Sequence, residues 1–275
     1  MDKVVDLHTH TNFSDGMLSP EELLKKAVGL GISAIAITDH DTVDGYKAAK
    51  EIVGDFPIEL VTGCEFSCYE NGKEYHLLGY EFDIENSFIK THVQHYHKFR
   101  FIRAKQIHSK LNKLGIEFSF DTIMEKANGA AIARPHIAAV MVDKEYVKDM
   151  REAFNLYLGE GRPAYHPKAN FPVGSAIEMI NNAGGVAVLA HPADFVTQKD
   201  LYKMIQSGLD GIEVNHPMHS ATQKKYYHSI AGQYWLLETG GSDFHGSRVY
   251  DEDNFGKFTV PYSVLESIRY HSFVK

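Results

Sequence analysis

The strand-like stretch VVDLHTH (residues 4–10) is followed by SPEELLKKA (residues 19–27) and by a second strand-like stretch, SAIAITDH (residues 33–40). Ser19 is a favoured N-cap residue, and Glu22 lies where the second partner of a capping box is expected. Short runs of Val, Ile and Ala on either side of this segment are typical of buried strands. The stretch therefore predicts a strand–helix–strand unit, whose two strands lie parallel in one sheet.

The same alternation continues through most of the chain. We expect further helices over 42–53, 173–182, 199–207 and 221–231, strands over 58–62, 185–189, 211–214 and 235–238, and a hairpin strand over 75–82. Between 88 and 165 the pattern changes to several helices, because apolar residues recur there at the 3.6-residue helical spacing. We therefore predict a mostly parallel α/β barrel formed by 1–87 and 166–275, with an inserted helical cap over 88–165.

The composition is that of an ordinary globular protein and argues against several classes of partner. The 275 residues carry a net charge of −8 without a basic block, which is unfavourable for binding duplex nucleic acid. No apolar run is long enough to cross a membrane, and the N-terminus lacks the apolar core of a signal peptide. Cys64 and Cys68 form no disulfide framework, so we expect two buried packing residues in a cytoplasmic protein. The oligomeric state stays open.

The 16 histidines stand out in this composition, and many of them follow predicted strands. Together with nearby carboxylates, the residues at strand ends, in the adjoining loop or in the hairpin are His8, His10, Asp15, His40, Glu65, His76, His191, Asp243 and His245. In a barrel the carboxyl ends of the strands converge on one face, where active sites form. His8 and His10 are two residues apart, so an extended segment points both side chains to the same side. These residue types in this arrangement predict a metal cluster.

A single His-x-His pair would be weak evidence for a metal site, because about one is expected by chance at this histidine frequency. His95 and His97 form such a pair in a polar helical stretch without a carboxylate partner, and we interpret them as surface residues. Asp6 lies two residues before His8 and is a candidate for orienting a ligand, with an ordinary residue at a strand start as the alternative. The metal prediction rests on the joint placement of histidines and carboxylates, for which core packing gives no reason.

The same residues form a recognisable set of motifs. They are Asp6-Leu7-His8-Thr9-His10, Ser14-Asp15-Gly16, Ile37-Thr38-Asp39-His40-Asp41, Gly63-Cys64-Glu65, His191-Pro192 and Gly241-Ser242-Asp243-Phe244-His245. In this order they resemble the motifs of the polymerase-and-histidinol-phosphatase (PHP) superfamily over nearly the whole chain. The resemblance implies a distorted (β/α)7 TIM-like barrel that binds two or three divalent metal ions.

The resemblance also implies how the ligands divide among the ions. The expected groups are His8, His10, Glu65 and Asp243 for the first ion, Glu65, His76 and His191 for the second, and Asp15, His40 and His245 for the third. Nitrogen and oxygen ligands without thiolates favour Mn²⁺, Fe²⁺ or Zn²⁺. Because ligating histidines must be neutral, we expect metal content and activity to fall together below about pH 6.

The cap resembles that of the nucleoside 3′,5′-bisphosphate phosphatases and the related 5′–3′ RNA-trimming enzymes, in residues 132–138 and 158–165. By that resemblance Arg134 and His136 would bind the phosphate of the substrate, with Arg103 as a further candidate. The chain departs from the bisphosphate phosphatases at Ala193-Asp194, because the corresponding motif of those phosphatases has Gly-Arg after His-Pro. An acidic residue in place of that arginine argues against a second phosphate on the substrate.

These features predict a metal-dependent phosphoesterase that hydrolyses a small phosphomonoester, with a nucleotide as the expected substrate. Metals lower the pKa of bound water to about 7, so we expect attack by a metal-bound hydroxide, with His245 as a candidate acid for the leaving group. The alternatives are 5′–3′ exonuclease action on short RNA, a metal-dependent amidohydrolase and a metal-dependent regulatory domain. Arg134 and Arg162 favour an anionic substrate over an amide.

Overall fold

An eight-stranded sheet forms the framework of the computed structural model, which describes residues 3–275. Its strands are β1 (Val4–Thr9), β2 (Ala34–Ile37), β3 (Glu59–Glu70), β4 (Lys73–Tyr80), β5 (Val186–Leu189), β6 (Gly211–Asn215), β7 (Leu237–Gly240) and β8 (Val260–Pro261). They lie in the order β7-β6-β5-β4-β3-β2-β1-β8. β1 to β3 are parallel neighbours, as are β5 to β7, whereas β4 runs antiparallel to β3 and β5, and β8 runs antiparallel to β1. The predicted α/β class is confirmed.

The two ends of this sheet meet, so that it forms a nearly closed barrel. After β7, the amide of Asp243 donates to the carbonyl of His8 at 2.9 Å, and the amide of His10 donates to the carbonyl of Phe244 at 2.9 Å. Gly241 is needed at this junction, because a Cβ there would lie 2.4 Å from the Cβ of His8. The predicted distorted TIM-like barrel is confirmed, and its closure depends on this close approach of two backbones.

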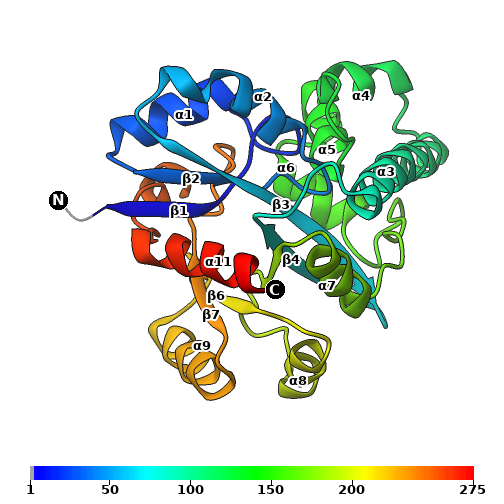
Figure 1. Cartoon of the computed structure of the whole chain (residues 1–275). Helices are drawn as coiled ribbons and strands as arrows, with labels where there is room; N and C mark the ends of the chain where they lie inside the picture. Colours follow the sequence, from blue (N-terminus) through cyan, green and yellow to red (C-terminus); the bar gives the residue numbers. More distant parts are fainter. Residues whose placement is uncertain (1–2) are drawn as a thin grey trace.

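Helices cover the outside of the barrel and one end of it. They are α1 (Pro20–Gly29), α2 (Asp44–Ile52), η1 (Val53–Asp55), α3 (Ser87–Lys113), α4 (Phe120–Ala127), α5 (Arg134–Asp143), α6 (Met150–Ala153), η2 (Phe154–Leu158), α7 (Val173–Asn182), α8 (Gln198–Gln206), α9 (Ala221–Tyr234), α10 (Asp251–Asn254) and α11 (Tyr262–Val274). Figure 1 shows α3 to α6 gathered together, apart from α8 and α9 beside β6 and β7. Within residues 3–275, no helix combines the length and apolar character needed to span a bilayer.

The first strand–helix–strand unit forms as its sequence predicts. The hydroxyl of Ser19 accepts a hydrogen bond from the amide of Glu22 at 3.3 Å, and the Glu22 carboxylate accepts one from the amide of Ser19 at 2.8 Å. Leu23 and Leu24 on the buried face of α1 pack with Ile35 of β2. Because capping and apolar spacing agree, the helix covers one side of the parallel pair of β1 and β2.

β3 and β4 form a longer hairpin than the sequence predicts. The expected strands cover 58–62 and 75–82, whereas β3 continues to Glu70 and β4 begins at Lys73. Polar residues interrupt the apolar pattern after residue 62, because one face of this hairpin lines a polar site instead of a core. Glu65 consequently lies in the middle of β3, and the expectation that it follows the end of a strand is wrong.

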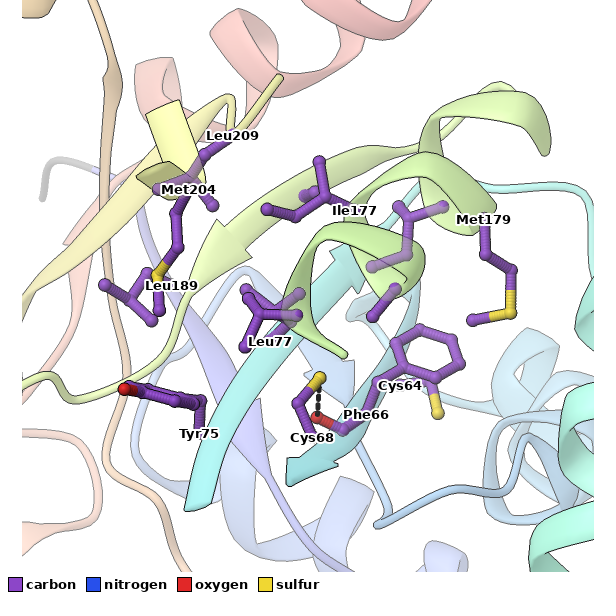
Figure 2. Close-up of a cluster of buried hydrophobic side chains, with 14 of the residues drawn as sticks. Cys64, Phe66, Cys68, Tyr75, Leu77, Ile177, Met179, Leu189, Met204 and Leu209 are labelled. Carbon is purple, nitrogen blue, oxygen red and sulfur yellow. Dashed lines mark hydrogen bonds between the residues drawn. The ribbon is translucent and has the colours of Figure 1, made fainter. Parts of the chain in front are cut away.

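Alternation along β3 separates a hydrophobic face from a polar one. Cys64, Phe66 and Cys68 pack with Leu77 of β4 and with Ile177 of α7 in one hydrophobic cluster (Figure 2). Both cysteines are free and fully buried, which confirms the prediction that they are packing residues. Glu65, which lies between Cys64 and Phe66, is therefore turned to the opposite face, toward the histidines of β1 and β4.

The helices from α3 to η2 share a hydrophobic cluster of their own. Ile107 of α3 packs there with Ile137 of α5 and Leu158 of η2. The first turns of α3 pack instead against the barrel, where Ile89 belongs to the cluster beneath the hairpin. α3 thus connects the barrel to the helical insertion, and the cap boundaries at 88 and 165 stay a prediction.

Candidate metal centre

All nine predicted metal ligands lie close together, most of them at or after the ends of barrel strands and two within the β3–β4 hairpin. They are His8 and His10 in or just after β1, Asp15 in the loop before α1, His40 after β2, Glu65 in β3, His76 in β4, His191 after β5, and Asp243 and His245 after β7. Positive φ angles occur here at Asp41 (54°), His191 (26°) and Asp243 (51°). Non-glycine residues rarely adopt such conformations, which persist where the surrounding structure enforces them and are common at functional sites.

Glu65 and Asp243 form the middle of this cluster. Oε2 of Glu65 lies 3.3 Å from Nε2 of His8 and 3.2 Å from Nε2 of His10. Oδ1 of Asp243 lies 3.4 Å and 3.2 Å from the same two nitrogens. All four residues are buried, and each offers one atom within 4.8 Å of the others. This group could hold one cation, and it contains the residues expected for the first ion.

A second group shares Glu65. Oε1 of Glu65 lies 2.8 Å from Nδ1 of His76 and 2.9 Å from Nε2 of His191. The structure adds His40 to this group, because its Nδ1 lies 3.2 Å from Oε2 of Glu65. With His8 and His10, Glu65 is therefore within ion-pair distance of five histidines.

The third group surrounds Asp15. Oδ1 of Asp15 lies 3.3 Å from Nε2 of His245, and Oδ2 lies 3.9 Å from Nε2 of His40. His10 joins these residues through its second ring nitrogen, 3.9 Å from Oδ1 of Asp15, and its ring stacks on His245 at 4.0 Å. The structure thus brings together the three residues expected for the third ion and links them to the first group through His10.

Many polar atoms of the cluster are buried without a hydrogen-bond partner among residues 3–275. They include Nε2 of His8, both ring nitrogens of His10, Oδ1 of Asp15, Nδ1 of His40, Oε2 of Glu65, Nδ1 of His76 and Nδ1 of His191. Each unsatisfied buried polar atom costs about 1–3 kcal/mol of stability. So many of them in one place indicate that a further group binds there and pairs with them. Imidazole nitrogens and carboxylate oxygens suit Zn²⁺, Mn²⁺ or Fe²⁺. The residues present therefore fit a cluster of divalent cations.

The electrostatics of the cluster favour charged carboxylates. Burial raises the pKa of Glu65, but the charges of His40 and His76 hold that pKa well below its usual range. Burial also opposes protonation of His10, yet its contacts with Asp243 and Glu65 raise its pKa to about 9. The pKa of His40 falls to about 3, chiefly because of burial. The site thus presents anionic oxygens together with at least one neutral imidazole at physiological pH.

Glu213 of β6 supports the centre and was missed by the sequence analysis. It is fully buried, and burial is outweighed by the charges of His8 and His216, which lower its pKa to about 2. Oε1 accepts a hydrogen bond from Nδ1 of His8 at 2.9 Å, and Oε2 accepts one from the amide of His191 at 2.8 Å. The signal was available, because Glu213 lies in the predicted strand 211–214 and the rule for strand ends applies there equally.

The missed residue His216, just after β6, lies beside Glu213 and is also buried. Nδ1 of His216 accepts a hydrogen bond from the amide of Met218 at 3.1 Å, so a neutral His216 carries its proton on Nε2. That nitrogen lies 3.6 Å from Oδ2 of Asp243. His8, Glu213 and His216 lie close enough to form a fourth group, but a protonated nitrogen cannot bind a metal. We interpret this group as support for the other three.

Further contacts hold the ligand backbone and Asp243 in place. Nη1 of Arg248, which no strand-end signal predicts, donates to Oδ2 of Asp243 at 2.8 Å and leaves Oδ1 facing the histidines. Oδ1 of Asp6 accepts hydrogen bonds from the amides of His8 and Ser242, at 3.2 Å and 3.0 Å. Asp6 therefore orients the ligand backbone, while the ring of His8 is oriented by Glu213.

His245 is arranged as a ligand more than as an acid. Its Nδ1 donates to the carbonyl of Asp243 at 2.8 Å, so a neutral His245 has its lone pair on Nε2, which faces Asp15. This tautomer leaves no proton on Nε2 for a leaving group. His95 and His97, by contrast, are exposed on α3 and belong to none of the groups, as the sequence analysis expects.

Basic side chains of the cap form a second feature of the site. Arg103 of α3 is buried, and its Nε donates to the carbonyl of His166 at 2.9 Å. Its Nη2 has no hydrogen-bond partner among the described residues. Burial and the neighbouring Arg134 and Arg100 lower the pKa of Arg103 to about 10. Arg100 is itself paired with Asp41, so an anion bound at Nη2 of Arg103 would offset the remaining repulsion on this guanidinium.

His136 at the start of α5 is close enough to Asp15 to feel the charge of that carboxylate. Its Nδ1 accepts a hydrogen bond from the amide of Ala133 at 3.1 Å, so a neutral His136 carries its proton on Nε2 and can donate it in a hydrogen bond. Burial lowers its pKa most, and the nearby charge of Asp15 opposes this effect. His136 is thus a hydrogen-bond donor close to the third ligand group. Arg162, by comparison, is exposed to solvent.

The departure at Ala193-Asp194 has a structural explanation. Oδ1 of Asp194 accepts a hydrogen bond from Nε2 of Gln223 on α9 at 2.8 Å, and the side chain is exposed. Its carboxylate is therefore engaged by a neighbouring helix. Because Gln223 is neutral, the carboxylate keeps its negative charge, and the unfavourable effect of Asp194 on a second phosphate stays a prediction.

Comparison with known proteins gives a consistent result. A family model described as PHP domain matches residues 6–158. The chain is 35% identical to a 5′-3′ exoribonuclease from Haemophilus influenzae, over 89% of this chain and 91% of that protein. It is 32% identical to a 3′,5′-nucleoside bisphosphate phosphatase from Chromobacterium violaceum, over 88% of this chain and 87% of that protein.

A solved structure from Bifidobacterium adolescentis, assigned as a metal-dependent phosphoesterase, superposes with a TM-score of 0.88 and 29% sequence identity. The match covers 97% of this chain and 96% of the other. The similarity therefore extends over the helical insertion as well as the barrel.

Proposed function

The chain belongs to the PHP domain family and is a metal-dependent phosphoesterase, and we propose that its substrate is a nucleotide phosphomonoester. The observation that carries this proposal is the buried histidine–carboxylate cluster, together with a buried cap arginine, Arg103, whose Nη2 has no partner among the described residues. An exoribonuclease and a nucleoside bisphosphate phosphatase are among its relatives, and a nucleotide phosphate is common to both names.

The proposed ligands divide into three linked groups. They are His8, His10, Glu65 and Asp243; His40, His76 and His191 around Glu65; and His10, Asp15, His40 and His245. Two or three ions of Mn²⁺, Fe²⁺ or Zn²⁺ bound there would polarise a phosphoryl oxygen and supply hydroxide at neutral pH. Glu65 contacts members of every group, so it is the residue that holds the ligand set together.

The proposed phosphate contacts come from the cap. Nη2 of Arg103 is buried without a partner among the described residues, and Arg134 lies close enough to lower its pKa. A phosphate oxygen would accept a charge-assisted hydrogen bond from this nitrogen, which also removes the cost of leaving it unpaired. His136 would donate from Nε2 on the side of Asp15. The cap residues thus bind and orient the phosphate against the ligand cluster.

Hydrolysis of a panel of substrates tests the proposal, with phosphate release measured for the phosphoesters and amine release for the amides. We would assay nucleotides, sugar phosphates and amides with added Mn²⁺, and expect turnover of the nucleotides. Glu65→Gln should abolish this activity, whereas His228→Ala should not change it, because His228 is exposed and pairs, among residues 3–275, only with Glu238. Turnover of amides in place of phosphoesters would overturn the proposal.

The cap residues are tested by a separate pair of variants. Arg103→Met and Arg134→Met should each raise KM for the nucleotide by about 10- to 100-fold, since each would lose a charge-assisted hydrogen bond worth about 1.5–3 kcal/mol. Bound metal should stay unchanged in both variants. Loss of metal with no change in KM would show that the arginines support the fold instead of the substrate.

A second candidate is 5′–3′ trimming of short RNA, which the 35% identity to an exoribonuclease favours. Mononucleotides and 5′-phosphorylated oligoribonucleotides of two to five residues would be compared by kcat/KM. A higher kcat/KM for the oligonucleotides would make short RNA the proposed substrate in place of a mononucleotide. A cytoplasmic location stays a prediction, made from the low cysteine content.

A further inference from the structure

We propose that Phe195 is an aromatic platform on which the base of the nucleotide stacks. This proposal rests on the proposed function, and it identifies the subsite for the part of the substrate that is not hydrolysed. Phe195 lies in the loop between β5 and α8, and its side chain is 42% exposed.

A cavity of about 270 Å³ lies directly beside the candidate metal centre. Its walls are formed by Glu74, His76, His191 and Phe195. His76 and His191 are two of the proposed metal ligands, so a phosphate at the centre is adjacent to this space. The remainder of the substrate can therefore extend into the cavity, where Phe195 is the only aromatic carbocycle among the four lining residues.

The loop that carries Phe195 is tied to α9 and to the segment just before it. The amide of Ala193 donates to Nε2 of His219 at 3.1 Å, and the carbonyl of Ala193 accepts a hydrogen bond from the hydroxyl of Tyr227 at 2.7 Å. Asp194 is held by Gln223. Phe195 thus follows two anchored residues, and a ring on an anchored loop loses less conformational freedom when a ligand binds. The sequence Ala193-Asp194 serves this anchoring.

The charges of the cavity wall favour a neutral group over a second phosphate. No arginine or lysine is among its four lining residues. The carboxylate of Glu74 is paired with Lys168 and accepts from Nε2 of His76. Since the guanidinium groups lie on the cap near Arg103, phosphate is attracted there, whereas the cavity beside Glu74 offers no unpaired cation. An uncharged heterocycle fits this wall better than an anion.

Stacking also explains the exposure of a large apolar ring at this place. Single exposed apolar residues are common on proteins, so exposure alone would carry no argument. An aromatic ring beside a phosphate-binding centre, however, provides a face for any base, because every base has a π-face. By alanine substitution, one such contact changes affinity by about 5- to 150-fold.

The experiment compares two substrates that differ only in the base. For Phe195→Ala we expect KM for a nucleoside 5′-monophosphate to rise by about 5- to 150-fold with little change in kcat. KM for ribose 5-phosphate should not change. Phe195→Trp should keep the affinity for the nucleotide, and Phe273→Ala, which removes an exposed ring at the end of α11, serves as the matched control. An equal change for both substrates, or for neither, would overturn the proposal.

Binding measurements test the base platform even if the proposed hydrolysis is not observed. If the unmodified protein hydrolyses neither substrate, the proposed function fails, and calorimetric titration of the Mn²⁺-loaded protein with the same nucleotide still tests the platform. Weaker binding of the nucleotide to Phe195→Ala, with equal binding of ribose 5-phosphate, would support it. Equal affinity of the two proteins for the nucleotide would contradict it.

Discussion

At the scale of single residues, buried carboxylates organise the candidate metal centre. Glu65 is within ion-pair distance of five histidines, and Glu213 holds the ring of His8 and the backbone of His191 from behind. Both carboxylates are fully buried, so their charges persist only because each is surrounded by donors. The order of the centre therefore depends on residues behind the ligands as much as on the ligands.

Glu213→Gln is expected to weaken metal binding by about 10- to 100-fold. The amide keeps the size of the side chain, but its NH2 group would face either Nδ1 of His8 or the amide of His191, which are both donors. Metal content after dialysis and the Kd from competition with a chelating dye would measure the change. Glu252→Gln, on an exposed side chain of α10, is the matched control. Unaltered affinity in the Glu213 variant would remove its assigned role.

Metal uptake is expected to release protons and to strengthen as pH rises from about 6.5 to 8.5. Despite opposing burial, their carboxylate neighbours raise the pKa of His10 to about 9 and that of His76 to about 10 in protein treated with a chelator. Both rings are then protonated at neutral pH, so a cation must displace a proton, and rising pH removes this competition. The pH range over which metal affinity rises therefore lies above the value of about pH 6 that histidines with an ordinary pKa would give.

Calorimetric titration with Mn²⁺ in two buffers of different ionisation enthalpy would count the released protons. We expect a positive number at pH 7 that decreases toward pH 9. An apparent Kd that is constant over the window would show that neither His10 nor His76 gives up a proton to the metal.

At the scale of elements, the hairpin of β3 and β4 and the ends of β1, β2, β5 and β7 place the ligands. Ser67 pairs with His76 across the hairpin, and Glu65 pairs with Leu78, so Glu65 and His76 lie diagonally on one face. The opposite face carries Cys64 and packs against α7. One pair of strands thus serves the core and the site at once, since side chains alternate between faces.

Ser19→Ala is expected to lower the free energy of unfolding by about 1 kcal/mol, because α1 would lose its capping box. Urea denaturation would measure the change, and the metal content should stay the same. Ser267→Ala on α11 is the control, since the Ser267 hydroxyl donates to the carbonyl of Ser263 in its own helix. Equal midpoints for Ser19→Ala and the unmodified protein would show that the cap adds nothing to stability.

At the scale of the whole molecule, closure of the barrel assembles the site. The centre unites residues from the first ten positions with residues beyond 240, through the contact of the β7 segment with β1. The cap adds its arginines through α3, which packs on both hydrophobic clusters. Binding of metal at this junction therefore links the two ends of the chain.

Mn²⁺ at about 100 times its Kd is expected to stabilise the fold by about 2.7 kcal/mol, which corresponds to a Tm increase of about 5 °C. A chelator should reverse the shift, because ligands from β1, β3, β4 and β7 would lose their common partner. Differential scanning calorimetry with and without the chelator measures it, and Glu65→Gln should show a much smaller shift. Identical Tm values in both conditions would count against metal binding at this junction.

Local rules explain what could be predicted from the sequence. Capping and apolar spacing specify the unit from residue 4 to residue 40, and the two-residue spacing puts His8 and His10 on one side. Alternation turns Cys64 away from the site. These features depend on neighbours within a few positions along the chain, so the nine candidate ligands could be named before their contacts were known.

Only the tertiary structure decided how these residues are supported. Glu213 meets His8 across 205 positions, Glu65 lies inside a strand that the polar pattern concealed, and Asp194 is tied to a helix 29 positions away. No periodicity records such contacts, because they arise when the barrel closes and distant segments become neighbours. The amino-acid sequence thus determined which chemistry the chain can perform, while closure of the barrel determined the orientation of the ligands and the cavity that His76, His191 and Phe195 line.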